Sequence, residues 1–200
     1  RHLDVIEDSA EDLVVEERAI AGIVCGRGGF IPARTVVLAT GTFLNGLAHI
    51  GFTHYPAGRA GDFPSVGIPA ALRRLRFPVG RLKTGTCPRL DVRTIDFEGL
   101  EAQTGDDPRP HFSFSRVDNP LPQVACHMTY TNERTHEIIR AALDRSPLYT
   151  GRILGTGPRY CPSIEDKVVK FAHRTRHQIF LEPEGLTSPR IYPNGISTSL

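Results

Sequence analysis

The run from Thr35 to Ala39 places the strongest constraint on the fold of this chain. Its sequence, Thr-Val-Val-Leu-Ala, is continuously strand-forming and almost wholly apolar, which is typical of a strand buried on both faces of a parallel sheet. Thr40 and Gly41 end the run. Because open α/β sheets bind ligands at the carboxyl ends of their strands, the sequence predicts an α/β protein with a ligand-binding edge here.

Further elements are predicted on both sides of this run. Asp12 to Glu16 is Val-rich strand sequence, Ala21 to Cys25 follows a turn, and Gly26 to Gly29 closes a hairpin before Phe30. Ser65 is a good N-cap for a short helix that buries Ile68, Leu72 and Leu75, spaced at i, i+4 and i+7.

The second half of the chain predicts one long helix and two strands. The helix runs from Glu133 to Asp144, with an inward face of Ile138, Ile139, Ala142 and Leu143, and Ser146-Pro147 ends it. The strands are Gln123 to Thr129 and His177 to Glu182.

Two features lead us to expect an internal fragment of a larger protein. No Gly-x-Gly-x-x-Gly turn leads from a first strand into a helix, although a nucleotide-binding domain needs that turn to hold phosphates. At the other end, Pro193 to Leu200 contains no predicted helix or strand.

The net charge of +2 conceals two basic stretches, which comprise Arg73, Arg74, Arg76, Arg81, Lys83 and Arg89 in the first and Lys167, Lys170, His173, Arg174 and Arg176 in the second. Each stretch is either a site for a polyanion or a solvated helix face. Within the first, Gly80 to Thr86 is a basic turn that either cradles phosphate or is an ordinary loop.

Several classes of protein are excluded or disfavoured. No apolar run approaches the length of a membrane span and no signal peptide is present, so we expect a cytoplasmic protein. The four cysteines lie far apart without a Cys-x-x-Cys motif, so we expect free thiols. His173 and His177 have i, i+4 spacing but are separated by cations, and we predict no metal site.

The segment from Gly157 to Phe171 predicts a turn that leads into a short helix. Ser163 is its N-cap, Asp166 has capping-box spacing, and Ile164, Val168 and Phe171 share one face. Cys161 precedes the helix beside Arg159 and Lys167, where backbone N–H groups and positive charge favour a thiolate or a bound phosphate. The alternative is a buried, inert thiol in a structural loop.

Several longer motifs resemble one enzyme family. They are Val37-Leu-Ala-Thr-Gly-Thr-Phe-Leu44, Gly58-Arg-Ala-Gly-Asp62, Gly80-Arg-Leu-Lys-Thr-Gly-Thr86, Asp144-Arg-Ser-Pro147, Gly157-Pro-Arg-Tyr-Cys-Pro-Ser-Ile-Glu-Asp-Lys167 and Phe180-Leu-Glu-Pro-Glu-Gly185. In this order they are similar to the middle of the MnmG/GidA family of FAD-dependent tRNA uridine 5-carboxymethylaminomethyl modification enzymes. Cys87 departs from the family pattern, which usually has a proline there.

The resemblance implies a fold, cofactors and site residues. The fold is α/β, with residues 1–86 as part of a Rossmann-like FAD-binding domain, 87–171 as an inserted mixed α/β domain that ends in the NAD-binding segment, and 172–200 as the return to the FAD-binding domain. FAD contacts fall on Ala10 and Ser65, and the catalytic role falls on Cys161. The NAD contacts are Gly157, Pro158, Arg159, Tyr160, Cys161, Pro162, Ser163, Ile164, Glu165, Asp166, Lys167, Val168, Val169, Lys170 and Phe171.

The family's activity implies further partners. NADH would reduce FAD, a folate would donate one carbon, and a GTPase partner of the MnmE type would act with a homodimeric enzyme on C5 of the wobble uridine of tRNA. Two alternatives stay open at this point. One is the related folate- and FAD-dependent tRNA uridine-54 methyltransferase; the other is a non-catalytic fragment that binds RNA or a partner, since we expect this chain alone to hold FAD poorly and to be inactive.

Overall fold

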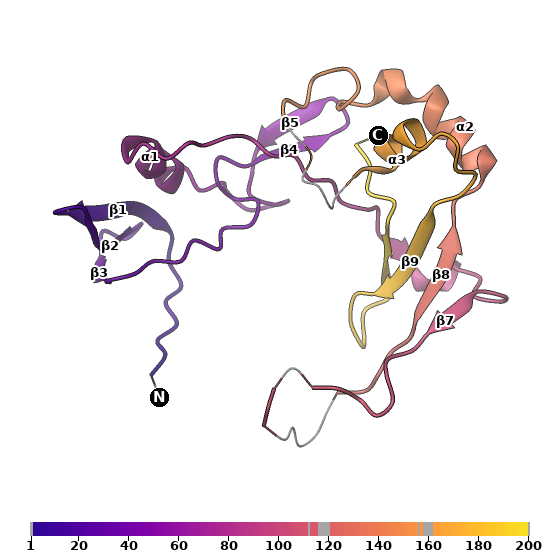
Figure 1. The fold of residues 1–200 in the computed structure, drawn as a ribbon, viewed down its shortest axis with the longest axis horizontal. Helices are drawn as coiled ribbons and strands as arrows, with labels where there is room; N and C mark the ends of the chain where they lie inside the picture. Colours follow the sequence, from indigo (N-terminus) through magenta and orange to yellow (C-terminus); the bar gives the residue numbers. More distant parts are fainter. Residues whose placement is uncertain (1, 112, 116–120, 156, 158–161, 200) are drawn as a thin grey trace. The chain divides into compact units, whose positions relative to one another are not determined.

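The computed structural model describes residues 2–111, 113–115, 121–155, 157 and 162–199. They form two compact units, Arg1–Arg81 and Leu82–Leu200 (Figure 1). No helix in the described part of the chain is long and apolar enough to cross a membrane.

The first unit is built on a three-stranded antiparallel sheet of strands β1 (Ala10–Glu16), β2 (Ala19–Cys25) and β3 (Phe30–Pro32), in that order. This confirms the predicted hairpin. Helix α1 (Gly67–Arg74) packs on β1, and its Ile68 and Ala71 form a core with Leu13. Leu72 and Leu75 pack against this core, as their helical spacing predicts. A separate hairpin joins β4 (Leu47–Ile50) to β5 (Thr53–Pro56).

The prediction that Ser65 caps α1 is wrong. The N-cap is Val66, whose side chain makes no capping hydrogen bond. Ser65 instead forms an isolated parallel bridge with Leu44, in which Ser65 N donates to Phe43 O at 2.9 Å and Asn45 N donates to Ser65 O at 2.8 Å. The backbone of Ser65 is therefore committed to this bridge, and the helix begins one residue later.

The predicted buried strand at Thr35 to Ala39 is also wrong. The segment has no strand assignment, and Val37 and Leu38 are 90% and 40% exposed. An apolar strand is buried only when neighbouring strands and covering helices are present, and no strand among the described residues pairs with this segment. Val36 packs against the core of the first unit, while Val37 and Leu38 remain exposed.

The second unit contains a five-stranded antiparallel sheet in the order β6-β10-β9-β8-β7. Its strands are β6 (Leu90–Asp91), β7 (Glu101–Gln103), β8 (Cys126–Tyr130), β9 (Gln178–Pro183) and β10 (Arg190–Asn194). Ile179, Leu181 and Ile191 form the core of this sheet. The strands predicted near 123–129 and 177–182 are confirmed, with shifts of a few residues at their ends.

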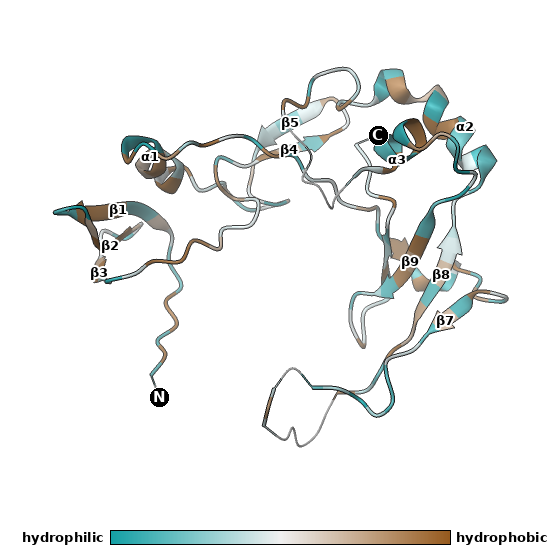
Figure 2. Ribbon diagram, in the orientation of Figure 1, coloured by the Kyte–Doolittle hydropathy of each residue, from teal (hydrophilic) through white to brown (hydrophobic). Residues whose placement is uncertain are grey.

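Two helices, α2 (Glu133–Ala141) and α3 (Ile164–Lys170), pack together through Ile139, Ile164 and Val168. Figure 2 shows both polar and apolar residues along α2, as an amphipathic helix requires. The predicted inward position of Ile138 is wrong, because this side chain is 62% exposed. The helix also ends earlier than predicted, and a 3₁₀ turn at Leu143–Arg145 continues it to Ser146.

The expectation that the last residues lack an anchor is wrong as well. After β10, Ser197 O accepts a hydrogen bond from Ile164 N at 2.7 Å, and Thr198 forms a bridge with Thr86. Strands β9 and β10 share one sheet with β6 to β8, so residues 172–199 are continuous in structure with the segment before them. The division of cofactor binding among 1–86, 87–171 and 172–200 stays a prediction.

Candidate functional site

The two residues predicted to contact FAD, Ala10 and Ser65, lie on adjoining segments of the first unit. Ala10 opens β1, where it pairs with Cys25. A Cβ atom placed on Gly67 would lie 2.1 Å from Glu11 O, so the backbones next to Ala10 and Ser65 are in direct contact. The side chain of Ser65 makes no hydrogen bond within the described residues, so its hydroxyl is free for a ligand.

The predicted run from Gly157 to Phe171 is described only in part. Pro158, Arg159, Tyr160 and Cys161 lie outside the described residues, so the predicted catalytic cysteine has no structural account here. The N-cap prediction is confirmed, since Ser163 Oγ accepts a hydrogen bond from Asp166 N at 3.2 Å. Phe171 does not share the buried face, because the helix ends before it and its side chain is 44% exposed.

The first turn of α3 differs from the predicted phosphate site. Two of its backbone donors already have partners, because Ile164 N donates to Ser197 O and Asp166 N donates to Ser163 Oγ. Glu165 and Asp166 also place two carboxylates in this turn. A phosphate at this helix end would compete with those acceptors and meet like charge, so the structure removes most of the reason for placing one there.

Glu165 is a buried carboxylate that joins α3 to the segment after β10. Its side chain is fully buried, and Oε1 accepts hydrogen bonds from Thr198 Oγ1 at 2.8 Å and from Ser199 N at 2.9 Å. Burial by itself raises the pKa of Glu165, but the hydrogen bonds outweigh it and the pKa is lowered. The second oxygen, Oε2, has no hydrogen-bond partner among the described residues.

Asp166 lies between two lysines near Gly157. Lys170 Nζ lies 2.8 Å from Asp166 Oδ1 and Lys83 Nζ lies 3.6 Å from Asp166 Oδ2. Burial opposes ionisation of Asp166, but these cations lower its pKa. A Cβ atom on Gly157 would lie 3.2 Å from Lys83 Cε. Lys83 therefore lies beside both Gly157 and the carboxylate of Asp166.

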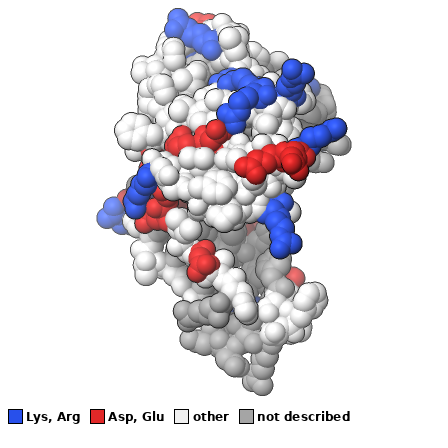
Figure 3. Space-filling view, turned by 90° about the vertical axis from the view of Figure 1, so that its left-hand side faces the viewer, with Lys and Arg blue, Asp and Glu red and all other residues white. Residues whose placement is uncertain are grey.

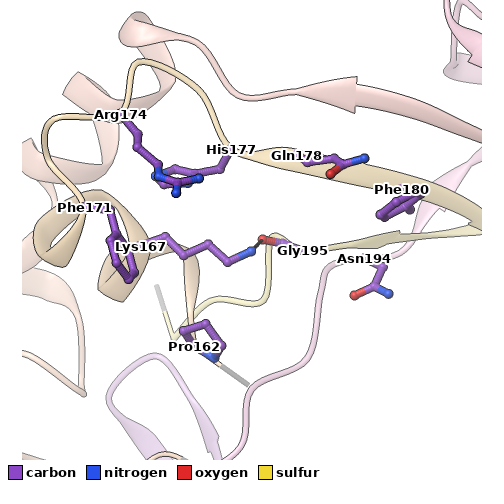
Figure 4. Close-up of a pocket in the computed structure, with 9 residues that line it drawn as sticks. All are labelled: Pro162, Lys167, Phe171, Arg174, His177, Gln178, Phe180, Asn194 and Gly195. Atoms are coloured by element: carbon purple, nitrogen blue, oxygen red, sulfur yellow. Dashed lines mark hydrogen bonds between the residues drawn. The ribbon is translucent and has the colours of Figure 1, made fainter. Parts of the chain in front are cut away.

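A cavity of about 450 Å³ lies alongside α3, between the helix and the strands β9 and β10 (Figure 4). The residues that line it are Pro162, Lys167, Phe171, Arg174, His177, Gln178, Phe180, Asn194 and Gly195. Lys167 Nζ donates to Gly195 O at 2.7 Å. A smaller cavity of about 110 Å³ shares Lys167 and Gly195 with it and reaches Cys87 and Tyr192.

His177 brings a buried imidazole to the larger cavity. The residue is 8% exposed, and its Nε2 has no hydrogen-bond partner among the described residues. Its ring stacks on His136, with centroids 5.1 Å apart. Burial and the charges of His136, Lys167 and Arg174 lower the pKa of His177, so the imidazole is neutral at pH 7.

The first basic stretch is largely occupied by contacts within the fold. Arg74 pairs with Asp12 at 2.6 Å, Arg81 donates to Asn45 O at 3.2 Å, and Arg89 pairs with Glu184. On the face of the molecule drawn in Figure 3, acidic side chains lie among the basic ones. Within the described residues, no group of three histidine, cysteine or acidic side chains lies close enough together to hold a metal ion.

Several residues of this region carry no functional signal in the sequence. Gln178, Phe180, Asn194 and Gly195 line the cavity but were considered only as strand or terminal residues. The Asn-Gly pair at 194–195 is a turn signal that could have indicated the end of a strand. The links of Glu165 to Thr198 and Ser199 join residues more than 30 positions apart, and local patterns carry no signal for such contacts.

Comparisons with known proteins cover the whole chain. A family model described as "Glucose inhibited division protein A" matches residues 1–200. The curated tRNA uridine 5-carboxymethylaminomethyl modification enzyme MnmG of Geobacter sulfurreducens is 58% identical over 199 residues, which are 100% of this chain and 32% of that protein. MnmG of Geotalea uraniireducens is 56% identical over 198 residues, or 99% of this chain and 32% of that protein. The chain thus spans about a third of the length of these relatives.

Solved structures agree with these sequence relatives. Aquifex aeolicus GidA in its form I crystal has a TM-score of 0.81 and 50% identity, covering 97% of this chain and 33% of that one. The same protein in its form II crystal has a TM-score of 0.79 and 46% identity, covering 96% of this chain and 31% of that one. This likeness confirms the predicted fold class, α/β with part of a Rossmann-like domain and an inserted mixed α/β domain. The curated relatives do not favour the uridine-54 methyltransferase alternative. Matched along its full length by the family model, two curated relatives and a solved fold, the chain belongs to the glucose inhibited division protein A (GidA) family, which includes MnmG.

Proposed function

We propose that this chain is the central part of an FAD-dependent enzyme that adds a carboxymethylaminomethyl or aminomethyl group to C5 of the wobble uridine of tRNA. The observation that carries the proposal is the identity of 58% and 56%, over essentially every residue of the chain, to two tRNA uridine 5-carboxymethylaminomethyl modification enzymes. At this level of identity, folds and site residues are normally shared.

The residues of the first unit fit a flavin. Ser65 offers a hydroxyl that the described fold does not use, and Ala10 offers backbone groups at the edge where β1 begins. FAD, when bound, supplies the redox chemistry. Ala10 and Ser65 hold and orient it in this proposal. The 200-residue chain alone contains few such contacts, so we expect it to bind FAD weakly and to be inactive by itself.

Lys83, rather than the end of helix α3, suits a dinucleotide phosphate near Gly157. Lys83 and Lys170 share the charge of Asp166, and Lys83 packs against Gly157. The Lys83 side chain beside Gly157 favours an anion there. We therefore assign NAD(H) to the first half of the run 157–171, with Lys83 as an additional contact.

Cys161 is the thiol that we assign to the pyrimidine, as nucleophile or as acid and base. A one-carbon unit from a folate, a GTPase partner of the MnmE type, a homodimeric assembly and a cytoplasmic site of action complete the proposal. These components follow from the family resemblance.

The test is a chimaera in which this chain replaces the corresponding third of the Geobacter sulfurreducens relative, as the only copy in a cell that lacks the enzyme. We expect mass spectrometry of tRNA nucleosides to show the modified wobble uridine. Cys161→Ser should abolish it, while the matched control Cys25→Ser, in the β2 strand, should not. A folded chimaera without modification would refute the activity, and full modification with Cys161→Ser would return that cysteine to a structural role.

A further inference from the structure

We propose that the cavity between α3 and strands β9 and β10 binds an unpaired nucleotide of an RNA strand, with its base against Phe171 and a phosphate at Arg174. The inference rests on the proposed function, because it names the place where such an enzyme holds part of its RNA. It also assigns the RNA-binding role to one of the two basic stretches.

The lining of the cavity favours an anion with an aromatic part. Lys167 and Arg174 are cations, and none of the nine described lining residues is acidic. Glu182 contacts one lining residue, and its Oε1 already accepts a hydrogen bond from Asn194 Nδ2 at 2.9 Å. The volume of about 450 Å³ lies within the range of pockets that bind small ligands, roughly 300–1,000 Å³.

Phe171 supplies an open aromatic face. It follows the last residue of α3, is 44% exposed, and has the guanidinium of Arg174 at 5.9 Å from its ring centre. Unpaired bases stack on such rings, and an arginine beside the ring holds the adjoining phosphate. Figure 4 shows Phe171, Lys167 and Arg174 around the same opening.

His177 adds a polar group that the fold leaves unused. Its buried Nε2 has no partner among the described residues, and an unsatisfied buried polar atom is costly unless a ligand or another group meets it. In a neutral imidazole, Nε2 is either a donor or an acceptor, depending on the tautomer, and either role suits the edge of a base. This atom is a second feature, independent of the charges, that indicates a ligand.

The surface next to the cavity repeats the pairing of arginine with an aromatic ring. Tyr130 pairs with Gln178 across β8 and β9, and Gln178 lines the cavity. Arg176 lies over the Tyr130 ring at 4.4 Å from its centre, and Tyr130 is 42% exposed. A polymer can contact both positions, whereas a single nucleotide can contact one. This repetition favours an RNA strand over a mononucleotide.

The first basic stretch is a poorer candidate. Arg74, Arg81 and Arg89 already bind Asp12, Asn45 O and Glu184. Binding RNA there would break those contacts, which reduces the net gain. Arg174 and Arg176 form no ion pair among the described residues, and their charges face only aromatic rings.

The experiment measures binding of a fluorescent anticodon stem-loop RNA to the chimaera by anisotropy, over a series of KCl concentrations. Arg174→Gln should weaken binding about 3- to 10-fold and make the slope of log K against log salt shallower by about 0.7, the value for one phosphate of a single strand. Phe171→Ala should weaken binding at least about fivefold without changing the slope, because stacking carries no charge. Arg73→Gln, a matched control in the exposed part of the first basic stretch, should change neither.

A second readout separates RNA from the dinucleotide. Circular dichroism first confirms that each variant melts as the parent does, and Arg174→Lys should retain the salt slope if the contact is to phosphate. The KM for NADH should be the same in all variants. If RNA affinity is unchanged and the KM for NADH rises in Arg174→Gln, the cavity belongs to the dinucleotide and the inference is overturned. If the parent chimaera binds no RNA at all, both the proposed function and the inference about the cavity fail.

Discussion

Replacing the buried Glu165 tests how the second unit is held together. Its Oε1 accepts two good hydrogen bonds, from Thr198 Oγ1 at 2.8 Å and Ser199 N at 2.9 Å, and a longer one from Ser199 Oγ at 3.3 Å. These contacts fix the segment after β10 to α3. Glu165→Ala would remove this shared acceptor from a fully buried position, so Thr198 Oγ1 and Ser199 N would each lose a hydrogen bond to a charged group.

The magnitude follows from the two shorter contacts. A hydrogen bond to a charged group contributes about 1.5–3 kcal/mol, so two of them give a loss of about 3–6 kcal/mol in the free energy of unfolding of the second unit. Glu165→Gln keeps an oxygen acceptor and loses only the charge, so its cost should be about 1–2 kcal/mol. The exposed Glu137 on α2 is the matched control, and Glu137→Ala should stay within about 0.5 kcal/mol.

The pH dependence gives a further check. Because the folded-state pKa of Glu165 is lowered, its charge stabilises the fold above the unfolded-state pKa of about 4.3. That stability is lost as the pH falls through the folded-state pKa. Glu165→Gln cannot titrate, so its stability should fall less between pH 5 and the acid limit than that of the parent chain.

Urea denaturation of the full chain, followed by circular dichroism at several pH values, measures both effects. The reasoning would be refuted if Glu165→Ala unfolded at the same urea concentration as the parent. The reasoning would also fail if the free energy of unfolding fell equally in Glu165→Gln and in the parent below pH 5. In that case the charge of the buried carboxylate would contribute nothing to stability.

Three further predictions follow from local geometry. Gly67→Ala should destabilise the first unit by about 1–3 kcal/mol, because its Cβ would lie 2.1 Å from Glu11 O, whereas Gly80→Ala meets no atom within 4 Å and should be nearly neutral in the same urea assay. Ser163→Ala should cost about 1 kcal/mol of stability by removing the N-cap of α3; an unchanged urea midpoint would contradict that role. Cys161 should react fastest with iodoacetamide at pH 7, as mass spectrometry of the peptides would show, because the other three thiols are buried or have a raised pKa: Cys25, Cys87 and Cys126. Faster labelling at any of those three would refute it.

Local patterns in the sequence predicted the elements that local forces determine. The hairpin of β2 and β3, the cap at Ser163 and the buried face of α1 all depend on residues a few positions apart, and the structure confirms each of them. The same reasoning failed at Ser65, since its backbone bonds to Phe43 and Asn45, some 20 residues away. A capping residue and a bridging residue look alike in sequence when the bridging partner is distant.

The buried-strand prediction at Thr35 to Ala39 failed for a related reason. Composition shows that a segment is suited to burial, but burial itself requires neighbours on both faces. In the described chain Val37 is 90% exposed. The apolar sequence therefore indicates that this segment can pack against other elements on both faces. It forms a buried strand only where those elements are present.

Most of the residues that follow Cys161 in the predicted NAD-binding run have a structural role. Ser163 caps α3, Glu165 holds the segment after β10, Asp166 binds Lys83 and Lys170, and Lys167 binds Gly195. Substitutions at these positions should therefore lower stability before they alter chemistry. A loss of tRNA modification at unchanged stability is informative only for a residue without such a structural task. Measuring unfolding and modification together for each variant thus separates residues that build the site from the residue that acts in it.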